Sequence, residues 1–184
     1  YLNLALKNRK KYIRRKPFPH IYFDNFLPKK LAITLSKEYP KIKNVDKNWR
    51  VHKNENVDRY FLEDSSLYKK NLKIFSMLVN SRKFLLFLET LTGVSSILPD
   101  PFFIGGGAMT TGKGGFLNIH ADFNYHHKLQ SWRKINALFY LTPNWKKNWG
   151  GNLEFWSKNK KKKIREIEPL FNRVVIFNTT SKSF

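Results

Sequence analysis

The stretch Phe116-Leu-Asn-Ile-His-Ala-Asp-Phe123 alternates apolar and polar residues in the second half of the sequence. Alternation of this kind is typical of a β-strand that has one face in a core. Further apolar segments follow one another between glycine, proline and polar turns: Phe102–Met109, Ile135–Leu141, Leu153–Trp156, Ile164–Ile167 and Arg173–Asn178. The sequence from Ile97 onward therefore predicts five or six strands with glycine-rich corners.

The first half of the chain predicts helices. One helix is expected over Lys29–Tyr39, and two more over Ser66–Val79 and Ser81–Leu91, the last ending at Gly93. The polar segment 41–65 is expected to be a surface loop. Helices followed by strands indicate an α+β domain built on an antiparallel sandwich or barrel, a common container for a metal site.

The length of 184 residues fits one domain. We expect a single unit over 1–184, in which residues 1–96 form a helical support packed on one sheet. Residues 97–184 are expected to form the strand-built core.

Composition excludes several classes of protein. The chain has no cysteine, which rules out disulfides, thiolate catalysis and zinc–thiolate sites. No apolar run reaches the roughly 18 residues of a membrane helix, so no membrane association is expected. The basic segment Tyr1–Lys16 lacks the apolar centre of a signal peptide. A cytoplasmic location is consistent with these absences.

The formal net charge of +22 has two readings. A polyanionic partner such as nucleic acid or the ribosome would account for it. Biased composition would also account for it, since the chain holds 26 lysines and only 9 arginines, whereas readers of nucleic acid usually favour arginine. The densest clusters are Lys7–Lys16 and Lys158–Lys163, and the second is expected to be a solvated hairpin tip.

His120 and Asp122 are the candidate metal ligands. Residues i and i+2 of a strand point to the same face, so this imidazole and carboxylate can bind one ion together. They would supply two of the three ligands of a 2-His-1-carboxylate facial triad, the arrangement typical of non-haem iron(II) oxygenases. A structural hydrogen bond between the two side chains is the alternative.

Four ordered blocks of the sequence resemble the prolyl-hydroxylase branch of the iron(II)- and 2-oxoglutarate-dependent oxygenases. They are Gly112–Asp122, Arg133–Trp145, Gly150–Trp156 and Ile167–Phe177. The likeness is greatest to the protein prolyl hydroxylases of the hypoxia-sensing kind. It implies a double-stranded β-helix core, also called a jelly roll or cupin-like barrel. It also implies Fe(II) and 2-oxoglutarate as cofactors, with ascorbate as a further candidate.

The resemblance also assigns roles to individual residues. His120 and Asp122 would hold iron, and Tyr140 would contact a carboxylate of 2-oxoglutarate. Leu138, Leu153 and Asn136 would line the co-substrate, and Arg133 would orient substrate at the mouth of the site. Plain core packing is equally compatible with the two leucines, and a core aromatic is the alternative for Tyr140.

The sequence departs from the family pattern at three places. Thr110 stands where hypoxia-type enzymes carry a second co-substrate tyrosine. The segment after Asp122 is longer and contains His126 and His127, which are expected to be exposed loop residues, with a substrate loop or a third ligand as alternatives. The distal histidine and the arginine or lysine for the far carboxylate of 2-oxoglutarate, together with the final strands of the barrel, are expected beyond Phe184. We therefore expect the 184-residue chain by itself to be inactive or weakly active.

The implied reaction is hydroxylation of an unactivated C–H bond, with decarboxylation of 2-oxoglutarate to succinate. A prolyl residue in a protein or peptide is the expected substrate. Three alternatives stay open: a basic nucleic-acid-binding module, an oxygenase of the same fold that acts on nucleic acid, and a barrel that has lost its metal.

Overall fold

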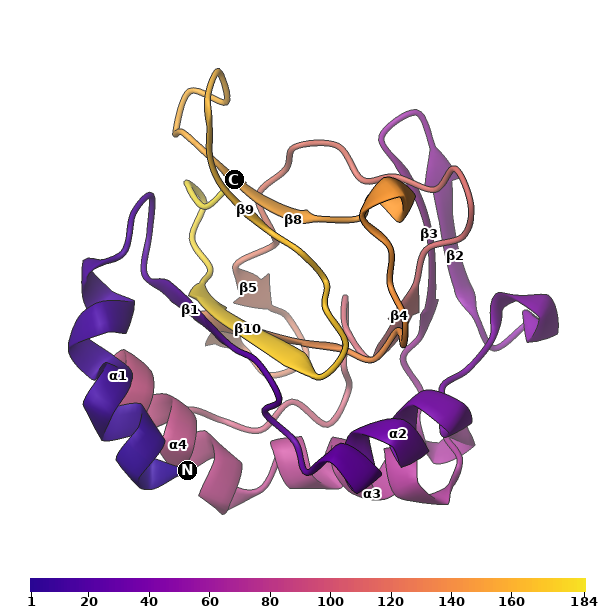
Figure 1. The fold of residues 1–184 in the computed structure, drawn as a ribbon, viewed down its shortest axis with the longest axis horizontal. Helices are drawn as coiled ribbons and strands as arrows, with labels where there is room; N and C mark the ends of the chain where they lie inside the picture. Colours follow the sequence, from indigo (N-terminus) through magenta and orange to yellow (C-terminus); the bar gives the residue numbers. More distant parts are fainter.

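The computed structural model describes residues 1–184 as a mixed assembly of helices and small antiparallel sheets. The helices are α1 (Leu2–Arg14), α2 (Lys29–Glu38), α3 (Lys70–Val79) and α4 (Arg82–Thr92), with 3-10 turns η1 (Ile42–Asn44), η2 (Ser65–Leu67) and η3 (Lys147–Trp149). The strands are β1 (His20–Phe23), β2 (Arg50–Asn54), β3 (Val57–Leu62), β4 (Ala108–Thr110), β5 (Tyr125–His126), β6 (Ser131–Trp132), β7 (Ile135–Tyr140), β8 (Leu153–Trp156), β9 (Lys163–Ile167) and β10 (Arg173–Asn178). The helices line one side of the molecule, and the strands fill the other side (Figure 1).

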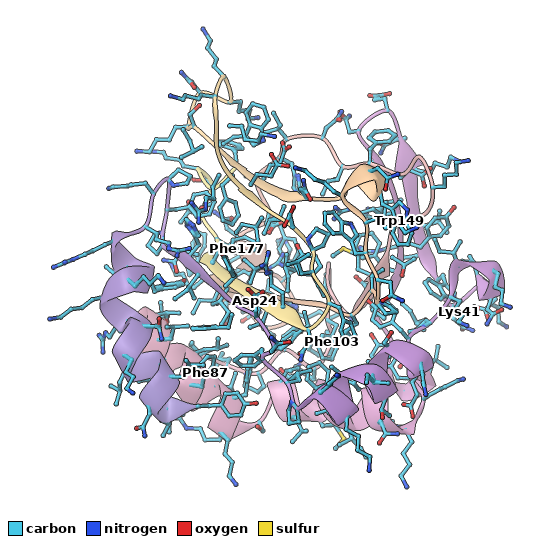
Figure 2. All side chains as sticks on the ribbon, in the orientation of Figure 1. Asp24, Lys41, Phe87, Phe103, Trp149 and Phe177 are labelled. Carbon is cyan, nitrogen blue, oxygen red and sulfur yellow. The ribbon has the colours of Figure 1, made fainter.

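The central sheet has the order β1-β10-β7, so the N-terminal strand β1 pairs with the last strand of the chain. Residues 173–177 of strand β10 are all buried, Val174–Phe177 are apolar, and the two faces of the strand pack in different clusters. Val174 and Ile176 pack with the helices, whereas Val175 and Phe177 pack with Phe155 of β8. Figure 2 shows Phe87 on the helical side and Phe177 among the strands. The sheet therefore separates a helical layer from a second, strand-lined layer.

The helical layer is held by packing between elements distant in sequence. Helix α1 lies along α4 (Figure 1), and it buries Ala5 and Tyr12 in the main core. Helix α4 begins at Ser81, whose side chain accepts a hydrogen bond from the Phe84 amide, and it ends at Gly93 with φ +79°. None of the helices is long and apolar enough to cross a lipid bilayer.

Three smaller sheets surround the second layer. Strands β2, β3 and β4 form one antiparallel sheet with β3 in the middle. Strands β8 and β9 form a hairpin, and β5 and β6 form a short hairpin just before β7.

Much of the predicted secondary structure is confirmed. Helices α2 and α4 and strands β7, β8, β9 and β10 lie within one or two residues of the predicted bounds, and the mixed helix and antiparallel-sheet class is confirmed. The lysine cluster at 158–163 lies at the tip of the β8–β9 hairpin, as expected. The single domain and the jelly-roll topology stay predictions.

Other predictions are wrong. The segment 41–65 is not a loop, because it forms the β2–β3 hairpin, so the first 96 residues are not purely helical. The basic start, for which no element was predicted, forms helix α1. The helix expected from Ser66 begins at Lys70, after a 3-10 turn. Only the end of Phe102–Met109 is a strand, and Phe116–Phe123 is irregular apart from a single bridge.

Candidate functional site

His120 and Asp122 lie on an extended but irregular segment that is attached to the β2–β3 hairpin. Leu117 forms an isolated bridge with Val57, and the Asp58 amide donates to the Phe116 carbonyl at 2.9 Å. Although the segment is not a regular strand, the two side chains meet as predicted, with His120 Nε2 3.3 Å from Asp122 Oδ1. The imidazole is 46% exposed and the carboxylate 27%, so the pair is accessible to a ligand from solvent.

Hydrogen bonds on the far side of each group leave the facing atoms free to bind a metal. His120 Nδ1 lies 2.8 Å from the Asn118 carbonyl, which can only accept, so Nδ1 carries a proton. Nε2 faces Asp122 and would turn its lone pair to a metal once it has lost its own proton. Asp122 Oδ2 accepts from Asn136 Nδ2 at 2.6 Å, and Oδ1 remains on the open side. Two adjacent ligands of an octahedral divalent ion lie about 3 Å apart. The separation of Nε2 and Oδ1 therefore fits two ligands of one such ion.

The two groups also stabilise each other's charged forms. The hydrogen bond to Asp122 raises the pKa of His120, against the opposing effect of burial. Burial by itself would raise the pKa of Asp122, but His120 and the cations of Arg133 and Arg59 lower it below its ordinary value. The carboxylate is thus held in the ionised form that a metal requires.

A third protein ligand does not join this pair within residues 1–184, where no three His, Asp or Glu side chains lie together in a way that could hold a metal. His126 is buried, contrary to expectation, with Nε2 3.5 Å from Asp100 Oδ1 and Nδ1 accepting from the Leu129 amide. His127 is exposed beside the Tyr125 ring. Neither histidine completes the metal site in this arrangement.

Strand β7 presents the predicted co-substrate residues on one face. Asn136, Leu138 and Tyr140 alternate toward the second layer, where the two apolar residues pack with Leu153 against the cluster around Phe155. Burial raises the pKa of Tyr140 to about 12, although the positive charges of nearby arginines oppose the shift. The hydroxyl therefore stays protonated at neutral pH and can donate a hydrogen bond to a carboxylate.

Arg133 is tied into the site instead of standing free at its mouth. Its Nη2 donates to Asn136 Oδ1 at 2.5 Å, and its guanidinium lies 4.5 Å above the Phe123 ring. Asn136 thus links Arg133 to Asp122 as a neutral spacer between a cation and an anion. A direct contact of Arg133 with substrate stays a prediction.

Arg59 on β3 is a residue of the site that sequence reasoning missed. Burial lowers the pKa of Arg59, and the nearby Tyr140 and Asp122 oppose that shift. The signal available in the sequence was the strand-forming composition of Val57-Asp-Arg-Tyr-Phe-Leu62, which the polar surroundings obscured. Thr110, the departure noted above, lies next to this strand on β4, paired with Tyr60.

Comparison with known proteins identifies the region that carries this geometry. Residues 106–183 match the family model of the 2OG-Fe(II) oxygenase superfamily. The matched part of the chain is therefore similar to the 2OG-Fe(II) oxygenase superfamily. The superfamily's name states its use of Fe(II) and 2-oxoglutarate, and the oxygenase region includes both candidate ligands, His120 and Asp122. No curated protein matches the sequence.

Solved structures of prolyl hydroxylases share the fold of the whole chain. A prolyl 4-hydroxylase from Pseudomonas putida aligns with a TM-score of 0.62 and 13% identity, over 98% of this chain and 88% of that one. A prolyl hydroxylase from Trichoplax adhaerens, solved with a peptide fragment of the hypoxia inducible factor oxygen degradation domain, aligns with a TM-score of 0.53 and 17% identity, over 99% and 80%. The chain is thus prolyl-hydroxylase-like in fold, including its N-terminal helices.

Proposed function

We propose that the chain is the iron(II)- and 2-oxoglutarate-binding body of an oxygenase that hydroxylates a prolyl residue in a peptide or protein. The observation that carries the proposal is the arrangement of His120 and Asp122. Each side chain is held by a hydrogen bond to its other polar atom. His120 Nε2 and Asp122 Oδ1 face each other at 3.3 Å. The pair lies within the region that matches the oxygenase family.

Bound iron, together with O₂ and the 2-oxo acid, would supply the oxidising power needed to hydroxylate an unactivated C–H bond. The protein's own part is to hold and orient. His120 and Asp122 would ligate the metal, and Asn136 would keep the carboxylate in place. The Tyr140 hydroxyl would donate to the co-substrate, and apolar Leu138 and Leu153 would exclude water beside it.

The remaining features of the proposal are a single jelly-roll domain and a peptide substrate positioned near Arg133. The fold shared with prolyl hydroxylases supports the domain, and the peptide in the Trichoplax adhaerens complex supports the substrate class. The comparisons give no support to a nucleic-acid or ribosomal partner, so composition bias is the simpler account of the positive charge. A cytoplasmic location and a role for ascorbate remain predictions.

Turnover and binding test the proposal together. The protein is incubated with Fe(II), 2-oxoglutarate and either a proline-containing peptide or the same peptide with alanine in place of proline. Succinate and the mass of the peptide are measured. Turnover by the 184-residue chain alone is expected to be weak or absent. Any oxygen atom that is transferred should appear only in the proline peptide, and chelation of the metal should abolish any succinate formation.

Matched variants identify the ligands. His120→Ala and Asp122→Ala should each abolish metal-dependent binding of 2-oxoglutarate and any turnover. His127→Ala removes an exposed histidine from the turn after β5 and should change neither. Unchanged binding and turnover in a ligand variant would overturn the proposal, as would a wild-type protein that binds neither Mn(II) nor 2-oxoglutarate.

A further inference from the structure

The segment that follows α1 packs against the β8–β9 hairpin. The ring centre of Phe155 on β8 lies 4.6 Å from that of Phe18 and 4.9 Å from that of His20, the first residue of β1. Arg165 on β9 is the direct cross-strand partner of Phe155, so the two side chains lie on the same face of the hairpin. His20 and Arg165 are therefore both neighbours of Phe155.

Arg15, at the end of α1, reaches the same face of β1. Its guanidinium carbon lies 5.7 Å from the centre of the Tyr22 ring. Tyr22 and His20 are two residues apart on β1, so their side chains point to one side of the strand, toward the cluster around Phe155. Packing contacts thus bring Arg15, His20 and Arg165 together from three elements of the chain.

Two polar atoms of this region are buried without a hydrogen-bond partner, Arg15 Nη1 and His20 Nε2. His20 is 1% exposed, and its Nδ1 lies 2.8 Å from the Phe18 carbonyl, which can only accept, so Nδ1 carries a proton. Burial lowers the pKa of His20, and the charges of Arg15 and Arg165 lower it further, so Nε2 is a free acceptor at neutral pH. Because buried polar groups are nearly always paired, a free donor and a free acceptor in one region indicate a polar ligand.

The two arginines also give this region an excess of positive charge. Three carboxylates of the neighbouring strands are already paired, Glu154 and Glu166 with Lys163, and Asp24 with Arg173. Burial lowers the pKa of Arg15, and the charge of Arg165 lowers it further. An anion bound between the two guanidinium groups would offset this repulsion.

We propose that Arg15, His20 and Arg165 form a binding site for a phosphate group, either free or at the end of a small ester. Each guanidinium presents parallel N–H groups that match two phosphate oxygens. A phosphate that keeps one proton also presents an O–H group, which donates to the free Nε2 of His20. Carboxylate and sulfate ions have no such proton at neutral pH.

The phosphate site is separate from the candidate metal site. Strand β10 lies between β1, which carries His20, and β7, which carries Asn136 beside Asp122. The inference is therefore independent of the proposed function, and its test needs neither metal nor 2-oxoglutarate.

Titration with inorganic phosphate, followed through the NMR signals of the histidine rings, tests the inference. The chain contains five histidines, so each ring can be observed separately. At pH 6, near the second pKa of a phosphate ester, and at constant ionic strength, the His20 signals should move and reach a plateau as phosphate is added. The signals of His52, exposed on β2 in a different sheet, should stay unchanged.

Variants of the arginines identify the groups that bind. Arg15→Met and Arg165→Met should each raise the dissociation constant for phosphate roughly 10- to 100-fold, as expected for the loss of a hydrogen bond to a charged group. Arg14→Met is the matched control, because it removes an exposed arginine from the adjacent position of the chain. It should change the dissociation constant by less than about 2-fold, since salt screens distant surface charges. Arg165 is itself exposed, so Arg165→Met still tests the site if Arg15→Met is unstable.

Two further ligands define what the site binds. Sulfate should bind more weakly than phosphate, because it cannot donate to His20 Nε2, and equal affinities would refute that contact. Methyl phosphate that moves the same signals would assign the site to phosphate esters. A response to inorganic phosphate alone would assign it to the free ion, and either of these results supports the proposal.

Two results would overturn the proposal outright. One is a set of His20 signals that do not move, or do not saturate, as phosphate is added to the wild-type protein. The other is a loss of affinity in Arg14→Met equal to that in Arg15→Met and Arg165→Met, because phosphate would then be attracted to the basic surface in general.

Discussion

Replacing Asn136 by leucine removes the link between the candidate metal ligand and the arginine beside it. The Asn136 side chain donates to Asp122 Oδ2 at 2.6 Å and accepts from Arg133 Nη2 at 2.5 Å. Leucine has nearly the same size and neither polar atom. Asp122 would keep its charge but lose the contact that fixes its orientation, and Arg133 would lose its hydrogen-bond acceptor.

The size of the effect follows from these contacts. Hydrogen bonds to charged groups contribute about 1.5–3 kcal/mol each. Loss of a residue that orients a metal ligand typically weakens metal binding roughly 10- to 100-fold. We therefore expect the dissociation constant for Mn(II) to rise by that factor in Asn136→Leu. The free energy of unfolding of the metal-free protein should fall by about 1–3 kcal/mol, since two polar groups lose their partner.

Calorimetric titration with Mn(II) measures the first effect, and urea denaturation measures the second. Asn178→Leu is the matched control, because Asn178 accepts a hydrogen bond from the Tyr12 hydroxyl within the central sheet. It should lower stability without changing metal affinity. Wild-type metal affinity in Asn136→Leu, alongside abolished binding in His120→Ala, would refute the role of Asn136 as the support of the carboxylate.

Three further predictions concern the fold. Ile176→Ala, at a fully buried site on β10, should cost about 2–5 kcal/mol in urea denaturation, whereas Ile74→Ala, 45% exposed on α3, should cost within about 0.5 kcal/mol. Gly107→Ala should lower the melting temperature, because Gly107 has φ +72° and an added Cβ would lie 2.7 Å from a backbone carbonyl. Hydrogen bonds from the Asn71 side chain and from the first turn of α3 lower the pKa of Glu38. The stability that this carboxylate contributes is therefore present at neutral pH and is lost as the group is protonated below about pH 4. The melting temperature of Glu38→Gln should therefore be lower than that of wild type at pH 7, and the difference should narrow in acid. A difference in melting temperature that does not depend on pH would contradict this role.

The predictable parts of the fold are those whose signals are local. Ser81 and Gly93 mark the ends of α4, because a side-chain cap and a left-handed residue are needed there whatever the tertiary structure. Val174–Phe177 of β10 form an unbroken apolar run, since both faces of the strand are covered. In both cases the local sequence is enough to predict the element, because the requirement is met by the residues of that element.

Helix α1 and the β2–β3 hairpin depend instead on contacts that the sequence does not display. Helix α1 is rich in lysine and arginine and buries only Ala5 and Tyr12, so its apolar face is narrow and is recognisable only once α4 packs against it. The hairpin has a largely polar sequence, and β2 buries none of its residues. A prediction based on hydrophobic alternation cannot detect such a strand.

The same distinction separates the two halves of the candidate site. His120 and Asp122 are two residues apart, and any extended backbone brings such side chains to one face, so the pair was visible without the fold and survives the irregular backbone that the structure shows. Arg59 lies more than 60 positions away in the sequence. It comes near the pair because the segment that carries His120 and Asp122 is bridged to the hairpin at Val57 and Leu117. The two candidate metal ligands are therefore local in sequence, whereas the arginine of the hairpin is brought towards them by tertiary structure.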